Sequence, residues 1–255
     1  MLKAQIQSGA RNKGYFLEKK AGNRGGVRLV KSRRDIIHQA EQMLGSTLVT
    51  VQTGPKGKLV SRVYVESYVK VTSIFYAGLA VDRLNAALTL LIAEIKDEDI
   101  SQIALNAPEK ILKIQLDLEG DTTPEQVHAV MDFLKLKPKS AKSLEVFING
   151  LHRAFVDNDA TMIEVNPAGV MKNGEIVALD AKISFDDNGL YRHQDILRLH
   201  DDYEASEREL QAEKYRFTYS EFDGSVGCIV NGDGIALAAM DSVSYTHLTL
   251  PTNSR

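Results

Sequence analysis

The chain of 255 residues has a single cysteine, Cys228, and this scarcity excludes an internal disulfide framework and any metal cluster built from cysteines alone. One thiol suits a reducing compartment, so we expect the cytoplasm or, in a eukaryote, the mitochondrial matrix. The neighbours of Cys228 are apolar, and we expect its side chain to be buried. No apolar run approaches the length that crosses a bilayer. The formal net charge is only −3, so charge gives no reason to expect nucleic acid or a membrane as partner.

The residues that are present indicate a globular α/β protein. Hydrophobic residues make up 44% and charged residues 25% of the chain, as in a protein with one large domain or two ordinary ones. Segments with strand character alternate with segments of helical periodicity, which predicts the α/β class. The expected strands are 27–30, 62–66, 74–83, 87–93 and 111–116, and the expected helices are 33–44, 97–105, 124–134 and 142–158.

Two apolar runs in the second half of the chain, at 162–167 and 177–182, read as neighbouring strands. The turn at 172–175 contains Asn-Gly, which is typical of a tight hairpin. Such a hairpin would bring Asn166 and Asp180 side by side. Mg²⁺ prefers oxygen ligands and takes only one or two from protein when phosphates and water supply the rest. An ordinary hairpin with an exposed Asp and a capping Asn explains the same spacing, so the residues alone leave both interpretations open.

Both ends of the chain have unusual features. Residues 1–6 read as a strand with nothing leading into it, so we expect the chain to be part of a longer protein. The acidic segment 201–215 predicts an exposed helix or linker, and 227–232 predicts a strand that feeds a glycine turn and the bare start of a helix. Residues 244–255 resemble translated cloning or adapter DNA. We expect a non-native tail there, with a genuine disordered tail as the alternative.

Several short motifs follow one another in order over nearly the whole chain up to Asp241. Two of them are Ile163-Glu164-Val165-Asn166-Pro167 and Leu179-Asp180-Ala181-Lys182. The others lie at 3–13, 25–27, 48–55, 63–66, 80–83, 185–188 and 227–232. In this order they resemble the β subunits of succinyl-CoA synthetase and of malate-CoA ligase, which belong to the ATP-grasp superfamily. Many motifs in one order are far more specific than any single one.

The resemblance implies a fold and an activity. The fold is an incomplete ATP-grasp domain at 1–219, lacking its N-terminal part, followed at 220–243 by the start of a flavodoxin-like CoA-ligase domain. The activity is an ATP-dependent ligation of succinate or malate to CoA, in which phosphoryl passes through a histidine of a partner α subunit. That covalent relay splits one difficult step into easier ones. The implied cofactor is Mg²⁺, the implied nucleotide is ATP, and the fragment is expected to be inactive alone.

The resemblance also implies roles for particular residues. The residues that it places against the nucleotide are Lys3, Ala10, Arg11, Asn12, Glu66 and Val69. Lys3 would contact the phosphates as a compact cation, and the backbone of 10–12 would cover them. Glu66 would face the adenine or ribose end. Asn166 and Asp180 would hold Mg²⁺, which neutralises charge during transfer. Glu164 would hydrogen-bond the phosphorylated histidine of the α subunit, and Asn231 would help to bind the carboxylate substrate.

Five places in the chain depart from the family pattern. Ala10 and Asn12 occupy glycine-like places, where a β-carbon limits positive φ and close approach of the backbone to phosphate. Ile74 stands where an acidic residue is expected, 92–96 replaces a Ser-Thr-Glu-Gly-Gly loop, and Asp233 replaces a small residue. These changes leave a second hypothesis, a non-catalytic paralogue that acts as a structural or regulatory subunit. The choices between succinate and malate, and between ATP and GTP, stay open.

Overall fold

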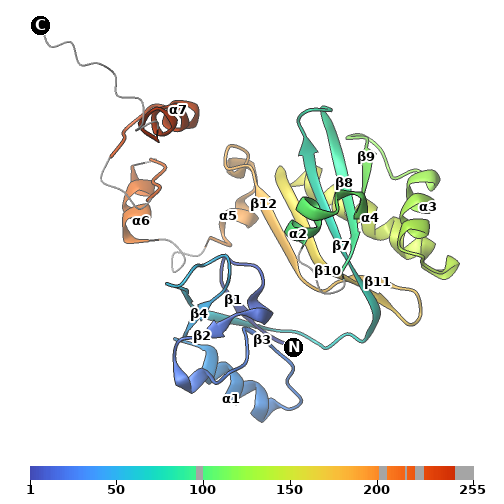
Figure 1. Cartoon of the computed structure of the whole chain (residues 1–255), viewed down its shortest axis with the longest axis horizontal. Coiled ribbons are helices and arrows are strands. Elements are labelled where there is room, and N and C mark those ends of the chain that lie inside the picture. The colour runs from blue at the N-terminus through green and yellow to red at the C-terminus, as the bar shows by residue number, and fades with distance from the viewer. Residues whose placement is uncertain (96–99, 201–205, 216, 222–226, 245–255) are drawn as a thin grey trace, which may run out of the picture. The chain divides into compact units, whose positions relative to one another are not determined.

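The computed structural model describes residues 1–95, 100–200, 206–215, 217–221 and 227–244. The chain divides into two compact units, Met1–Glu204 and Ala205–Arg255 (Figure 1). Nearly all of the expected tail, at 245–255, and the first part of the acidic segment, at 201–205, lie outside the described residues. None of the helices within the described ranges combines the length and the apolar character needed to cross a membrane.

The first part of unit Met1–Glu204 contains two small antiparallel sheets and one helix. One sheet has the order β3-β1-β6 and the other the order β2-β4-β5. Their strands are β1 (Leu2–Gln5), β2 (Tyr15–Phe16), β3 (Val27–Arg28), β4 (Thr47–Val49), β5 (Lys58–Leu59) and β6 (Arg62–Val65). Helix α1 (Arg33–Met43) begins where the Ser32 side chain accepts a hydrogen bond from the amide of Asp35. Leu2, Met43 and Leu48 are fully buried together, which joins both sheets and the helix into one core.

The larger sheet of the same unit has the antiparallel order β11-β10-β7-β8-β9, and β12 also pairs with β10. Its strands are β7 (Val71–Asp82), β8 (Ala87–Glu94), β9 (Ile111–Leu116), β10 (Ala160–Met171), β11 (Ile176–Ala178) and β12 (Ala181–Phe185). On β8 the side chains of Leu88, Leu90 and Ile92 are buried on one face. This period of two directs the neighbouring residues of the strands to the opposite face.

Two helices, α3 (Pro124–Phe133) and α4 (Ala141–Asp157), cover the apolar face of the larger sheet. Leu144 and Ile148 of α4 are fully buried at helical spacing, and Phe147 packs edge-to-face against Phe75 of β7. Thr123 and Gln126 form the capping box that begins α3. The remaining helical segments of this unit are α2 (Ile100–Asn106), α5 (Gln194–Leu197) and the 3₁₀ turns η1 (Arg11–Lys13), η2 (Lys19–Ala21), η3 (Pro108–Lys110), η4 (Pro138–Ser140) and η5 (Leu190–Arg192).

Most elements predicted in the first unit are confirmed within a few residues at their ends, but the run expected as one strand at 177–182 is divided between β11 and β12. Of these elements, only the start of the helix expected at 97–105 falls outside the described residues. In the second unit, α6 (Glu207–Lys214) confirms the exposed helix. The prediction of a strand at 227–232 is wrong. Ile229 is fully exposed, and the described part of this unit offers no strand to pair with that backbone.

Cys228 is exposed for the same reason, contrary to the expectation that it is buried. The helix that follows, α7 (Asp233–Ser244), is also longer than the bare start that was predicted.

Candidate functional site

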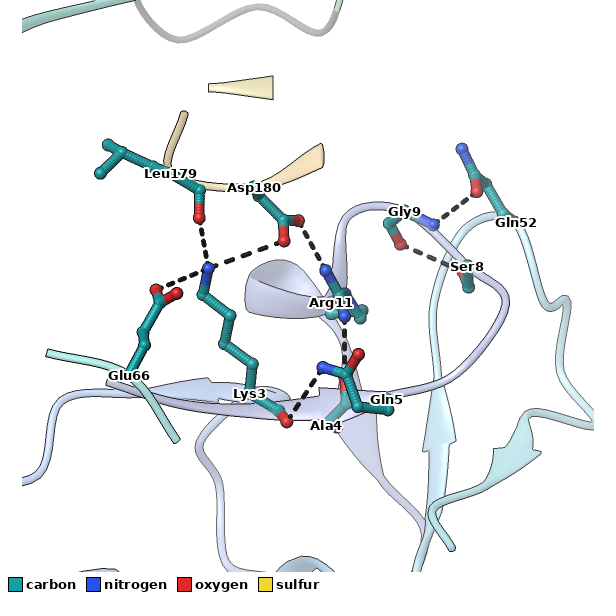
Figure 2. Close-up of polar contacts among 10 residues, drawn as sticks. All are labelled: Lys3, Ala4, Gln5, Ser8, Gly9, Arg11, Gln52, Glu66, Leu179 and Asp180. Atoms are coloured by element: carbon teal, nitrogen blue, oxygen red, sulfur yellow. Dashed lines mark hydrogen bonds and ion pairs between the residues drawn. The ribbon is translucent and has the colours of Figure 1, made fainter. Parts of the chain in front are cut away.

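Lys3 lies on β1 with its ammonium group among three acceptors (Figure 2). Its Nζ is 2.7 Å from Glu66 Oε1 and 3.6 Å from Asp180 Oδ1, and it donates a hydrogen bond to the carbonyl of Leu179. Only 9% of the side chain is exposed. Because a buried ammonium is costly without partners, these contacts hold β1 against the segment that precedes β12.

Arg11 contacts the same aspartate from a second direction. Its Nη2 is 2.5 Å from Asp180 Oδ2, and its Nη1 donates to the carbonyl of Ala4 at 2.8 Å. Both carboxylate oxygens of Asp180 therefore face cations, Lys3 on one side and Arg11 on the other (Figure 2). The sequence interpretation gave Arg11 a role through its backbone only. No local pattern reveals this side-chain contact, because 169 positions separate the two residues.

The loop between β1 and η1 is held in place from the side by β4 and the turn after it. The amide of Gly9 donates to Gln52 Oε1 at 2.6 Å, and the hydroxyls of Ser8 and Thr50 are 2.5 Å apart. Just before β3, a β-carbon on Gly25 would lie 2.3 Å from the carbonyl oxygen of Asn12 in η1. Glycine at 25 is thus required by a close approach of two backbone segments.

Ala10 has φ 53° and ψ 26°, the left-handed conformation that the glycine expected at this place adopts without strain. Asn12 does not share this feature, because it lies inside η1 and is not among the residues with positive φ. The predicted conflict with a β-carbon therefore exists at Ala10 and not at Asn12.

Replacing Ala10 with glycine should raise the free energy of unfolding by about 0.5–1 kcal/mol, since relief of left-handed strain outweighs the greater freedom of glycine in the unfolded chain. Urea unfolding measures the change. The matched control is Ala141→Gly, at φ −55° and ψ −52° in the right-handed helical region, where the same substitution should destabilise. Equal destabilisation by both substitutions would contradict the prediction.

Asn166 and Asp180 lie side by side, as the hairpin predicted. The amide of Asn166 donates to the carbonyl of Asp180 at 2.9 Å, β10 and β11 pair through Ala168 and Ala178, and Gly174 has φ 98° in the turn. The side chain of Asn166 is exposed and that of Asp180 is 38% exposed.

This donor set suits a hard cation that takes one amide and one carboxylate oxygen from protein and completes its shell with phosphate and water. The described residues contain no group of three or more acidic, His or Cys side chains placed to hold a metal.

Glu164 lies on β10 and accepts a hydrogen bond from the hydroxyl of Tyr76 on β7, at 3.0 Å. Tyr76 is only 5% exposed. Burial, and then the negative charge of Glu164, raise the pKa of the Tyr76 phenol far above its usual value, so it is a donor at neutral pH. The sequence interpretation did not include Tyr76. The alternation of β7 could have indicated it, because Tyr76 shares a face with Gly78, the cross-strand partner of Glu164.

The remaining predicted residues belong to other segments of the chain. Val69 is half-buried in the segment between β6 and β7. Ile74, at the start of β7, borders a cavity of about 320 Å³ that Phe75, Glu94 and Leu136 also line. Asn231 belongs to the second unit, where it is exposed directly before α7.

Comparison with known proteins finds relatives over nearly the whole chain. The chain is 42% identical to the proteins named succinate–CoA ligase [ADP-forming] subunit beta of Afipia carboxidovorans and of Bradyrhizobium diazoefficiens, over 95% of this chain and 61% of each relative. The chain thus spans about three fifths of the length of the curated relatives it matches. Among solved structures, ATP citrate lyase from Methanothrix soehngenii has a TM-score of 0.62 at 17% identity, over 96% of this chain and 55% of that one. That likeness concerns the fold alone.

A comparison of the chain with known protein families confirms the superfamily that the motifs resemble. Residues 1–170 match the family described as the ATP-grasp domain, which is two thirds of the chain and includes β1 to β10 nearly to its end. The chain therefore belongs to the ATP-grasp domain family.

Proposed function

We propose that the chain is the nucleotide-binding part of the β subunit of an ATP-dependent carboxylate–CoA ligase of the succinate–CoA ligase type. The observation that carries the proposal is the cluster of Lys3, Arg11, Glu66 and Asp180, which gathers two cations and two carboxylates from separate segments beside Asn166. The names of the relatives support the choice of ligase. Succinate is the favoured acid, and malate is the alternative.

In the proposed reaction, Lys3 and Arg11 bind the phosphates of ATP. Both cations are held on Asp180 in this structure, and phosphate oxygens offer them a competing set of acceptors. As the cations turn to the phosphates, the carboxylate of Asp180 becomes available beside Asn166, and these two residues would hold Mg²⁺. A bound Mg²⁺ supplies charge neutralisation on the transferring phosphoryl group. Glu66 keeps Lys3 aligned through the 2.7 Å contact.

Glu164 receives the phosphorylated histidine of the α subunit in this proposal. Its carboxylate accepts a hydrogen bond from the imidazole and so orients the ring for transfer. The α subunit also carries CoA, and Asn231 of the second unit assists in binding the acid. Backbone atoms of Ala10, Arg11 and Asn12 cover the phosphates, Glu66 faces the adenine or ribose end, and Val69 also contacts the nucleotide.

The test is a ligase assay of the full-length gene product assembled with its α subunit, with CoA and Mg-ATP, on succinate and on malate in parallel. We expect CoA-thioester formation that depends on Mg²⁺ and is faster with succinate. Phosphorylation of the α-subunit histidine without either acid provides the control for the first half-reaction. Absence of both products from a folded complex would contradict the proposal.

A second candidate, the non-catalytic paralogue, is favoured by two observations. Ala10 holds a left-handed conformation that glycine adopts more easily, and Ile74 presents an apolar side chain where a carboxylate is expected. In that case the chain keeps the fold and the contact with the α subunit but binds nucleotide poorly. Calorimetric titration with Mg-ATP distinguishes the two candidates.

Replacing Ile74 with glutamate separates them further. In an active ligase the new carboxylate can accept a hydrogen bond from the nucleotide, worth on the order of 1 kcal/mol, so the KM for ATP should fall several-fold. The nearby Glu94 limits this gain by like-charge repulsion. The matched control, Ile74→Gln, adds a polar side chain without charge and should give a smaller change. A protein without activity in either form supports the paralogue.

A further inference from the structure

Tyr76, Gly78 and Glu164 form one arrangement across two paired strands. Glu164 of β10 lies directly opposite Gly78 of β7, and Tyr76 precedes Gly78 by two residues on the same face. A β-carbon on Gly78 would lie 2.5 Å from the Tyr76 hydroxyl oxygen and 2.9 Å from ring atoms Cε1 and Cζ. The tyrosine ring therefore occupies the space that a side chain at 78 would fill, and from there its hydroxyl reaches Glu164.

The hydrogen bond has one direction at neutral pH. The phenol of Tyr76 stays protonated, because burial and the adjacent carboxylate both raise its pKa. It therefore donates, and Glu164 Oε1 accepts at 3.0 Å. A half-buried glutamate with three side-chain torsions has considerable rotational freedom, and one hydrogen bond from a rigid, buried ring removes much of it.

We propose that Tyr76 is the positioning residue that orients the Glu164 carboxylate toward the incoming phosphohistidine, and that Gly78 must lack a side chain so that the Tyr76 ring can lie there. The inference rests on the proposed role of Glu164. The hydrogen bond to Oε1 fixes the plane of the carboxylate, so Oε2 is presented to a donor that arrives from the α subunit. Tyr76 acts only through Glu164 and makes no contact with the reacting atoms.

The kinetic test uses the full-length complex and measures the rate of histidine phosphorylation together with the Kd for Mg-ATP. Tyr76→Phe should lower the rate by about tenfold and leave the Kd within about twofold, because carboxylate orientation is lost while the nucleotide contacts are kept. Gly78→Ala should give a similar loss although it retains the phenol. Tyr15→Phe, at an exposed tyrosine of β2, is the matched control and should leave both values unchanged.

A double-mutant cycle shows whether Tyr76 acts through Glu164. In the Glu164→Gln background, Tyr76→Phe should cause no further loss of rate, since the carboxylate that it orients is gone. Additive losses, or a wild-type rate in Tyr76→Phe, would overturn the inference. A wild-type complex that never phosphorylates the histidine would instead contradict the proposed function. This cycle does not depend on the folding of Gly78→Ala.

Alkaline stability tests the contact without any activity. Because the pKa of Tyr76 is higher in the folded chain than in the unfolded chain, the associated stability is complete below about pH 10 and is lost as pH rises toward the folded-state pKa. Urea midpoints of the 255-residue chain at pH 8 and pH 11 should therefore fall less in Tyr76→Phe than in wild type. Glu164→Gln should also lose less stability between pH 8 and pH 11 than wild type, because the carboxylate contributes to the raised pKa of Tyr76. Identical alkaline losses in all variants would overturn the inference even if the complex is active.

Discussion

Replacing Asp180 with alanine should abolish Mg²⁺-dependent phosphorylation of the α-subunit histidine, with a loss of rate of at least about 1000-fold. Asp180 lies beside Asn166 in the hairpin, and its backbone carbonyl accepts a hydrogen bond from the Asn166 amide. Without it, Asn166 alone would have to hold a hard cation, and charge on the transferring phosphoryl group would lack its main stabiliser. Quantifying phosphohistidine by intact-protein mass spectrometry after a timed reaction measures the loss.

Asp180→Ala should also lower the stability of the fold, because Asp180 pairs with both Lys3 and Arg11. Arg11 and Lys3 are only 12% and 9% exposed, and both lose their contact with the carboxylate. Asp180 itself is 38% exposed, so water screens part of the effect, and we expect a loss of about 1–2 kcal/mol in the free energy of unfolding.

The matched control for Asp180 is Asp187→Ala, an exposed aspartate in the turn after β12, which should leave both the rate and the unfolding midpoint unchanged. Phosphorylation at the wild-type rate in Asp180→Ala would show that Asp180 serves only as an ion-pair partner at the end of a strand.

Replacing Lys3 with methionine should weaken Mg-ATP binding by about 30- to 100-fold, which corresponds to about 2–3 kcal/mol of binding free energy. Methionine keeps the buried apolar stem of the side chain and removes only the ammonium group, so the packing of β1 is conserved. The lost contact is a charge-assisted hydrogen bond to phosphate in a site where only 9% of the side chain faces water. Calorimetric titration at constant salt measures the affinity.

Lys3→Met also leaves Glu66 without its 2.7 Å partner, and this structural effect has to be separated from the loss of binding. The double variant Lys3→Met with Glu66→Gln removes the unpaired charge, so it should recover stability without recovering affinity. Lys58→Met, an exposed lysine on β5, is the matched control. Unchanged affinity in Lys3→Met would show that Lys3 is a structural ion-pair residue.

Local sequence patterns were sufficient to predict most of the helices and strands. Helix α4 follows from Leu144, Ile148 and Phe155 at helical spacing, and the β10–β11 hairpin follows from Asn173-Gly174 between two apolar runs. The incorrect prediction of a strand at 227–232 also came from a local pattern. An apolar run there has strand propensity, but a strand exists only where a second strand accepts its hydrogen bonds, and the described part of that unit contains none.

The sequence by itself determined the family and indicated candidate site residues, since both depend on residue type and order along the chain. Only the tertiary structure decided which of them meet. Lys3 reaches the Leu179 carbonyl across 176 positions, Arg11 reaches Asp180 across 169, and Tyr76 reaches Glu164 across 88. The Tyr76–Glu164 contact arises from the pairing of β7 with β10, whereas the Lys3 and Arg11 contacts connect two separate sheets. Periodicity over a few residues contains no information about either arrangement.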